Sequence, residues 1–123
     1  MIEGVVNSTY EAVIPLYLRG PAGQAQEVEA VIDTGFTGFV TLPPSLVTEL
    51  GLVFMGTSEA TLADGSEVSF DAYDVTVVWE GQPRDVLIDE ADTTPLVGML
   101  LLDRHNLNID VENGGRVLIQ AKT

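Results

Sequence analysis

The sequence contains no cysteine, one histidine and only five basic residues among 123. Without cysteine it forms neither disulfide bonds nor thiolate metal sites. The single histidine, His105, cannot supply the two or three imidazoles of a typical zinc site. The five basic residues face 19 acidic ones, and the net charge of −14 leaves no positive surface for nucleic acid or anionic lipid. We therefore expect no metal, no cofactor, no nucleic-acid partner and no membrane partner.

Long hydrophobic runs are also missing. The longest apolar stretch, Leu96 to Leu102, is interrupted by Gly98 and is much too short to span a membrane. The first residues lack the basic stretch that opens a signal peptide, so we expect a cytoplasmic protein. Hydrophobic residues still make up 46% of the sequence, which argues against disorder. The length suits one domain, which we expect to span residues 1–123.

Hydrophobic residues mostly alternate with polar ones, and a period of two predicts strands. A short helix is predicted from Pro44 to Leu50, because proline suits its first position and Gly51 its end. A second short helix is predicted from Met99 to Asn106. The expected strands cover residues 10–18, 27–32, 59–62, 68–79, 85–88, 96–98, 107–111 and 117–119. The sequence therefore predicts a mostly β domain with about two short helices.

Three local signals predict details of these strands. Pro15 has no N–H to donate, which predicts a strand edge or a bulge. The alternation shifts by one residue at Ala72 and Tyr73, which predicts a bulge there. Ala63-Asp64-Gly65-Ser66 lies between two alternating segments and offers a glycine for a positive φ, which predicts a hairpin turn.

The segment from Val31 to Gly38 is the most informative for function, since it contains Asp33-Thr34-Gly35. An apolar strand here ends in a turn that carries a carboxylate out of the core, and Gly35 permits a close backbone approach. Partly apolar surroundings favour a protonated carboxyl group, which acid–base catalysis near neutral pH requires. Asp-Thr-Gly is also an ordinary turn sequence, so the tripeptide alone leaves a purely structural role open.

The surroundings of this tripeptide resemble a known family. Ala30 to Leu42 resembles the active-site turn of the retroviral-type (retropepsin-like) aspartic proteases, in particular of their small cellular and bacterial members. Leu62-Ala63-Asp64-Gly65-Ser66 falls where that family carries its flap hairpin. Pro95-Leu96-Val97-Gly98 is similar to the family's second hallmark, two apolar residues and a glycine before a helix. The resemblance extends from Tyr10 to Ile119 and implies an all-β, retropepsin-like, closed or partly open barrel with a flap hairpin.

The resemblance also implies an activity. In this family two aspartates share a proton and together activate water. This chain has one Asp-Thr-Gly and is too short for two lobes, so the resemblance implies a homodimeric aspartic endopeptidase acting on a peptide or protein substrate. The implied catalytic residues are Asp33, Thr34 and Gly35. The implied substrate-binding residues are Phe36, Leu62, Ala63, Asp64, Gly65, Ser66, Val97 and Gly98.

The sequence departs from the viral pattern at two positions. Met99 follows Gly98 where viral members carry a bracing arginine, which leaves Arg104 as the nearest substitute. Phe36 replaces a small residue after the tripeptide. In viral members the chain termini of two subunits interleave into a sheet, and residues 2–6 and 117–120 are candidates for that role.

Two other interpretations stay open. The chain is a catalytically silent retropepsin-fold module for dimerisation or peptide binding, or it is an unrelated acidic β domain that binds cations or a basic partner. A Ser-His-Asp triad is disfavoured because the sequence lacks a Gly-x-Ser-x-Gly elbow. We expect His105 to be a surface or helix-end residue.

Overall fold

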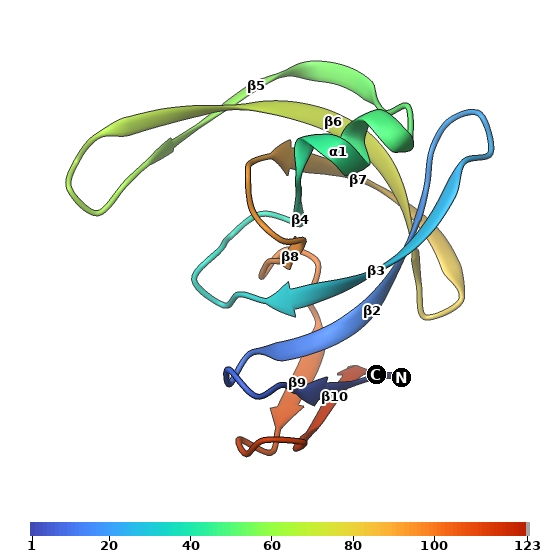
Figure 1. Ribbon diagram of the computed structural model, residues 1–123, viewed down its shortest axis with the longest axis vertical. Coiled ribbons are helices and arrows are strands. Elements are labelled where there is room, and N and C mark those ends of the chain that lie inside the picture. Colours follow the sequence, from blue (N-terminus) through green and yellow to red (C-terminus); the bar gives the residue numbers. More distant parts are fainter. Residues whose placement is uncertain (123) are drawn as a thin grey trace.

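The computed structural model describes residues 1–122, which form ten strands and one short helix (Figure 1). The elements are β1 (Ile2–Val6), β2 (Ala12–Arg19), β3 (Ala25–Ile32), β4 (Val40–Leu42), α1 (Pro44–Glu49), β5 (Val53–Thr61), β6 (Glu67–Trp79), β7 (Gln82–Glu90), β8 (Leu96–Val97), β9 (His105–Ile109) and β10 (Arg116–Ala121).

Six of these strands close into a barrel. In order around it, β6, β7, β4, β8, β3 and β2 lie side by side, and β2 pairs again with β6. The β3–β8 and β4–β7 pairs are parallel, and the other pairs of the barrel are antiparallel. The prediction of an all-β barrel is confirmed. Because β3 and β8 are parallel, their carboxyl ends meet, and residues 33 and 98 follow them on the same side of the barrel.

The barrel interior is the hydrophobic core. On β2, Ile14, Leu16 and Leu18 are buried, while Pro15 and Tyr17 between them point outward, as the alternation of a strand requires. Buried side chains from the other barrel strands include Ala30, Val40, Leu42, Val75, Val77, Val86, Ile88 and Val97. This packed interior gives the loops at the strand ends a rigid base.

The helix α1 adds Val47 and Leu50 to the core. Pro44 is its first residue and Gly51, with a φ of 59°, follows its end, so the predicted start and stop are confirmed. Within residues 1–122 no helix has the length and hydropathy that crossing a membrane requires.

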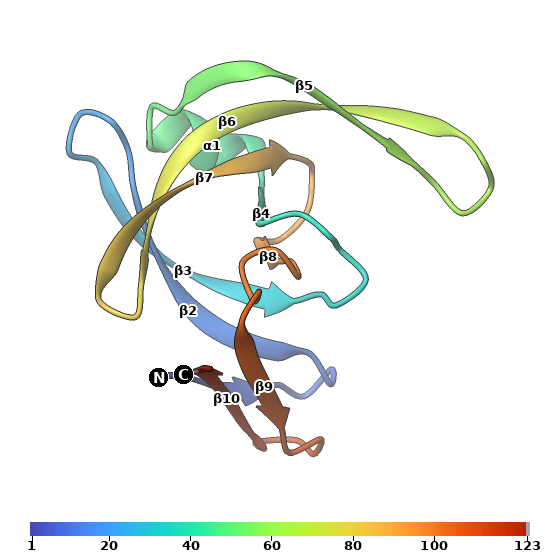
Figure 2. The same cartoon turned by 180° about the vertical axis from the view of Figure 1, so that it is seen from behind.

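Two groups of strands extend beyond the barrel. β5 pairs only with β6, and the two form a long hairpin that projects away from it (Figures 1 and 2). On the other side, β1 continues the sheet from β2, followed by β10 and β9. β10 therefore has β1 on one edge and β9 on the other. Residues 2–6 and 117–120, the candidates for interleaving with a partner's termini, pair with each other within one chain.

The predicted bulge lies at the expected level but on the neighbouring strand. Tyr73 pairs with Phe54 and Ala72 pairs with Gly56, so the extra residue is Met55 on β5. β6 itself keeps a regular register with β7 through this region. The predicted bulge near Ala72 and Tyr73 is therefore confirmed, and the inserted residue belongs to the strand opposite.

Pro15 lies in a gap between two partners of β2. β2 pairs with β1 at residues 12–13 and with β6 at residues 17–19, while β3 covers its other edge from residue 13 to residue 19. Pro15 thus stands where one edge of β2 has no strand beside it, and its missing N–H costs no ladder bond there.

The second predicted helix does not form. Residues 99–104 make hydrogen-bonded turns, and β9 begins at His105. Arg104 has a φ of 64°, which a right-handed helix cannot contain. Leu101 and Leu102 are adjacent in the sequence and both are buried in the core, so this leucine-rich segment packs as a turn and not as one face of a helix.

Candidate active site

Asp33 is the first residue after β3, and the backbone around it is held by hydrogen bonds. Its N–H donates to the carbonyl oxygen of Val97 at 2.9 Å, which continues the β3–β8 ladder. Its own carbonyl accepts the N–H of Phe36 at 3.1 Å. Its Oδ1 accepts the N–H of Gly35 at 2.9 Å, so the turn orients the carboxylate. The Asp33 side chain is half-buried, while Thr34 and Gly35 are exposed.

The loop that follows Asp33 is fixed to the turn after β8. Three backbone N–H groups bridge the two segments: Gly98 donates to Phe39, Met99 to Phe36 and Leu100 to Gly38, at 2.8–3.1 Å. The loop from residue 33 to residue 39 therefore has the same hydrogen-bonded support as a strand, although it has no regular structure. A carboxylate carried by such a loop has a defined position.

Phe36 packs against two glycines of this arrangement. A Cβ on Gly38 would lie 2.6 Å from Cζ of the Phe36 ring, and a Cβ on Gly98 would lie 2.6 Å from Cδ2. The ring thus occupies the space that side chains at both positions would take. Phe36, one of the two departures from the viral pattern, fills the junction between the Asp33 loop and the turn after β8.

A cleft of about 470 Å³ opens beside Asp33 and Thr34. Its lining comes from β1, β2, β3, β8 and β9 and includes Tyr10, Ile32, Ile109 and Val111. Tyr10 and Val111 are 65% and 75% exposed, which is unusual for an aromatic and a branched aliphatic side chain next to a half-buried carboxylate. One wall of the candidate site is therefore an open apolar surface.

The tip of the β5–β6 hairpin contains the five predicted flap residues, Leu62 to Ser66, all exposed. Leu62 donates its N–H to the carbonyl of Ser66 at 2.7 Å, and Gly65 has a φ of 86°. Asp64 accepts the N–H and the hydroxyl of Ser66 at 2.9 and 2.6 Å. The hydroxyl bond, and after it the N–H bond, lower the pKa of Asp64 below its ordinary value. The tip is thus a preformed turn closed by an ionised side chain.

The hairpin tip and the Asp33 loop lie at the same side of the molecule, at the left in Figure 1 and at the right in Figure 2. The tip residues are not part of the lining of the Asp33 cleft. Val97 is fully buried in the barrel, so its side chain belongs to the core and only its carbonyl reaches the Asp33 loop. Val97 therefore packs in the core, and a role in lining a substrate subsite stays a prediction.

A basic residue does support the turn after β8, but it is Arg84 on β7. Its Nη1 donates to the carbonyl oxygen of Leu101 at 3.4 Å, and its guanidinium lies 5.6 Å from the centre of the Phe39 ring. Arg104, the substitute expected from the sequence, is exposed and contacts the C-terminal segment, where its carbonyl accepts the N–H of Lys122. No local signal could have identified Arg84, because the strand pairing brings it there.

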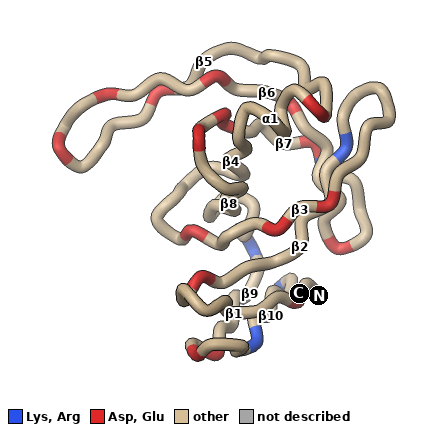
Figure 3. Tube along the Cα trace, in the orientation of Figure 1, with Lys and Arg blue, Asp and Glu red and all other residues tan. Residues whose placement is uncertain are grey.

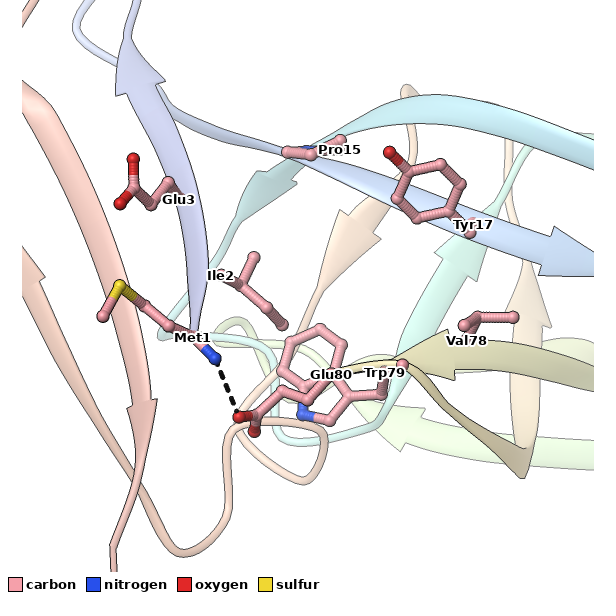
Figure 4. A pocket seen from close by; sticks show the side chains of 9 residues that line it. Met1, Ile2, Glu3, Pro15, Tyr17, Val78, Trp79 and Glu80 are labelled. Carbon is pink, nitrogen blue, oxygen red and sulfur yellow. Dashed lines mark hydrogen bonds and ion pairs between the residues drawn. The ribbon is translucent and has the colours of Figure 1, made fainter.

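His105 lies away from Asp33 and is not a free surface residue. Its side chain is 10% exposed and its Nε2 is 2.7 Å from Oε1 of Glu80 and 3.1 Å from Nε1 of Trp79. The amino group of Met1 donates to Oε2 of the same Glu80 at 3.1 Å, at the edge of a separate hollow lined by Ile2, Tyr17 and Trp79 (Figure 4). The hydrogen bond from His105 and then that from the amino terminus lower the pKa of Glu80. This cluster is a structural contact between β6, β9 and the N-terminus.

In the part of the chain that the structure describes, no three His, Cys, Asp or Glu side chains are grouped as metal ligands would be.

The barrel described above and one solved structure together confirm the predicted retropepsin-like all-β fold. The chain is similar to the crystal structure of a retropepsin-like aspartic protease from Rickettsia conorii, with a TM-score of 0.60 and 16% sequence identity. The similarity covers 98% of this chain and 90% of the other, and at this identity it describes the fold. The sequence matches no protein-family model and no curated protein.

Proposed function

We propose that the protein is an aspartic endopeptidase that acts as a homodimer, with one Asp33 from each subunit forming the catalytic pair. The observation that carries this proposal is the position of Asp33. It follows a core strand of a retropepsin-like barrel, in a turn whose backbone and carboxylate are both held by hydrogen bonds.

A second carboxylate is required by the chemistry. Two carboxyl groups within hydrogen-bonding distance do not both ionise easily, so one keeps a proton while the other is charged. The charged Asp33 accepts a proton from water, which attacks the peptide carbonyl carbon, and the partner's Asp33 donates its proton to the carbonyl oxygen. The tetrahedral intermediate collapses when Asp33 gives the proton it took from water to the amide nitrogen, which leaves, while the partner's Asp33 takes back a proton from a hydroxyl of the intermediate as the carbonyl re-forms. No bond forms between enzyme and substrate.

The neighbours of Asp33 have supporting roles in this proposal. Thr34 is exposed beside Asp33, where its hydroxyl bonds across the dimer axis. Gly35 leaves room for the substrate backbone, and Phe36 holds the loop in place. Gly98 contributes close packing beneath the loop, and the side chain of Val97 stays in the core.

The β5–β6 hairpin serves as the flap. An extended peptide lies between it and the Asp33 loops and adds a strand, so that alternate side chains enter apolar subsites. Leu62, Ala63, Asp64, Gly65 and Ser66 close over the peptide and exclude water. The preformed turn of Asp64 and Ser66 supports this role, because an ordered tip loses little entropy on closing.

The other candidate function is a catalytically silent module that binds peptides or dimerises through the same fold. The position of Asp33-Thr34-Gly35 at the end of β3 favours the enzyme, while the bond from the Gly35 N–H to Asp33 is a use that a silent module would share.

The deciding experiment compares wild type with Asp33→Asn on a diverse peptide library between about pH 4 and pH 7. Asp92→Asn is the matched control, because Asp92 also precedes a threonine but lies exposed in the loop between β7 and β8. We expect cleavage by wild type and Asp92→Asn and none by Asp33→Asn. Equal cleavage by all three proteins, or none by any, would remove the enzymatic proposal. Peptide binding by wild type and Asp33→Asn without cleavage by either would favour the silent module.

A further inference from the structure

We propose that His105 is a pH-sensitive switch, whose Nε2 accepts the N–H of Trp79 when the ring is neutral and donates to Glu80 when the ring is protonated. The inference concerns a part of the fold away from Asp33 and does not depend on the proposed function. It rests on a conflict at one atom, because this nitrogen has a donor and an acceptor within hydrogen-bonding distance at the same time.

Trp79 and Glu80 make opposite demands on Nε2 of His105. The indole N–H of Trp79, whose nitrogen lies 3.1 Å away, can only donate, so it needs a lone pair on Nε2. Oε1 of Glu80 lies 2.7 Å away and, when the carboxyl group is ionised, can only accept, so it needs a proton on Nε2. A ring nitrogen carries either a lone pair or a proton, and it therefore satisfies one of these neighbours at a time.

The other ring nitrogen decides which form satisfies which neighbour. Nδ1 of His105 lies 2.8 Å from the carbonyl oxygen of Asp103, which can only accept, so Nδ1 carries a proton in both forms. A neutral ring has one proton, and with that proton on Nδ1 its Nε2 accepts from Trp79. A protonated ring also has a proton on Nε2, which bonds to Glu80 and leaves the Trp79 N–H without its acceptor. Uptake of one proton therefore exchanges one hydrogen bond for the other.

Glu80 stays charged while this exchange takes place. Hydrogen bonds from His105 and then from the amino group of Met1 lower the pKa of Glu80 below its ordinary value of 4.5. The amino group also holds Oε2 of the same carboxylate at 3.1 Å, which keeps Glu80 in its place beside the ring. As pH falls from neutral towards this range, the carboxylate remains an acceptor, and the proton is taken up by the ring.

The switch lies where the barrel meets the terminal strands. Trp79 is the last residue of β6 and Glu80 follows it in the turn to β7, whereas His105 is the first residue of β9. In the sheet that residues 1–122 form, β9 pairs with β10 alone, so the His105 side chain directly links the start of β9 to β6. The Trp79 and His105 rings also meet edge to face, with their centres 5.7 Å apart. Protonation moves this link from an indole that is 6% exposed to the turn that follows it.

Further charged groups surround the ring on the turn before β9, after β10 and at the start of β1, namely Asp103, Arg104, Lys122 and the amino group of Met1. Figure 3 shows basic positions near β9 and β10, whereas the β5–β6 hairpin carries acidic residues and no basic one. The charges around His105 are thus of both signs. A test of the switch therefore has to observe the ring and the indole themselves, and not only a property that depends on total charge.

The composition of the chain makes both partners directly observable. It has one histidine and one tryptophan, so each side chain gives a single set of signals in NMR spectra. We expect the ring signals of His105 and the indole N–H signal of Trp79 to move with one midpoint as pH is lowered from about 8 to about 5. The indole proton is expected to move upfield, because it loses its acceptor. Before this transition, the nitrogen signals of the ring are expected to show the proton on Nδ1.

This measurement needs no substitution, and three results would overturn the inference. One is an indole signal that stays constant while His105 takes up its proton. Another is a neutral ring with its proton on Nε2, since that form already donates to Glu80. The third is a ring that takes up no proton over the whole range.

Three variants identify the groups involved. His105→Phe keeps an aromatic ring beside Trp79 without a nitrogen, so the indole signal is expected to lose its pH dependence, and a transition that persists contradicts the switch. Glu80→Gln removes the charged acceptor, so we expect the indole to keep its bond to His105 further into acid. Glu3→Gln is the matched control, because Glu3 lines the same hollow as Glu80 but bonds to Arg116, and we expect it to leave the midpoint unchanged. An equal shift in both glutamate variants would assign the effect to net charge and overturn the exchange between Trp79 and Glu80.

Discussion

The Phe36 ring lies directly over the Cα of Gly98, and this contact joins the loop of Asp33 to the turn after β8. A Cβ on Gly98 would lie 2.6 Å from Cδ2 of the ring, and it would also overlap the carbonyl oxygen of Gly38. A Cβ on Gly38, by contrast, would meet only ring atoms of Phe36. The two glycines are therefore required for different reasons. A side chain at residue 38 would clash with the Phe36 ring, whereas a side chain at residue 98 would clash with both the ring and the backbone.

This difference predicts an outcome for double substitutions. We expect Gly38→Ala and Phe36→Ala each to lower the free energy of unfolding by about 1–3 kcal/mol, through overpacking and lost burial respectively. Their combination is expected to cost less than the sum by about 1 kcal/mol or more, because removing the ring removes the clash. Gly98→Ala is not rescued by Phe36→Ala, since its contact with the Gly38 carbonyl remains. Urea unfolding of the three single variants and the two double variants with Phe36→Ala measures these free energies.

Gly23→Ala is the control for the cost of alanine itself. Gly23 has a φ of 85° and open space around its Cα, so the substitution adds backbone strain without a clash. We expect a loss of stability of about 1 kcal/mol there, with peptide cleavage unchanged. If Phe36→Ala rescued Gly98→Ala as fully as it rescues Gly38→Ala, the backbone contact would be unimportant.

Arg84 is expected to brace the turn that supports Asp33. Its guanidinium bonds to the carbonyl of Leu101 and lies over the Phe39 ring, and both contacts disappear in Arg84→Met while the aliphatic stem remains. We expect a loss of about 1–2 kcal/mol in unfolding free energy, together with a fall in kcat/KM as the loop loosens.

Arg104→Met is the matched control for Arg84→Met, since it removes the same charge from an exposed residue. We expect a change within about 0.5 kcal/mol and normal cleavage. If Arg104→Met lowered stability and cleavage more than Arg84→Met, then Arg104, the residue suggested by the sequence, would be the one that supports the turn.

Arg84 and Arg104 show which contacts local sequence patterns can predict and which they cannot. Local signals locate most elements: alternation gives most of the strands, although not β1, β4 or the first part of β5, and Pro44 with Gly51 bounds α1. The family pattern locates Asp33 because the residues that hold it, from the end of β3 through the following turn, are consecutive in the sequence. The contacts made by Arg84, by contrast, come from pairing between strands far apart in the chain, and no local pattern encodes them.

The partners of the terminal strands, and the strand that carries the bulge, are details that local patterns do not encode. Residues 2–6 and 117–120 are equally suited to pair within a chain or between chains, and the hydrophobic pattern of a strand does not name its partner. A phase change at Ala72 and Tyr73 likewise marks a register shift without saying which of two paired strands carries the extra residue, here Met55 on β5.

Glu80 is expected to make stability depend on pH. Hydrogen bonds from His105 and from the amino terminus lower the pKa of Glu80 below its ordinary value. Its folded state thus favours the carboxylate, and this contribution is present above the ordinary value of 4.5 and is lost as pH falls through the lowered one. We expect Glu80→Gln to lower the free energy of unfolding near neutral pH, and the gap from wild type to close in acid.

Urea unfolding of wild type and Glu80→Gln at several pH values measures that gap. Glu3→Gln serves as control, because the ion pair of Glu3 with Arg116 is more than half exposed on both sides. We expect this pair to contribute no more than about 0.5 kcal/mol at any pH. A gap for Glu80→Gln that stays constant into acid would show that its ion pairs do not carry the effect.

The charge of −14 that excludes nucleic acid also governs how two copies meet. Each chain brings the same excess to the proposed dimer, and Glu11 lines the cleft beside Asp33. Salt shortens the range of this repulsion from about 10 Å at 0.1 M to about 3 Å at 1 M, so we expect the dimer to tighten with added salt. Protonation relieves like charges brought together, so association takes up protons and strengthens as pH falls. Sedimentation across salt and pH measures both trends, and Glu11→Gln is expected to flatten the salt dependence more than Glu49→Gln on α1, although both remove one charge. A salt dependence equal in the two variants would assign the repulsion to net charge rather than to charges beside Asp33.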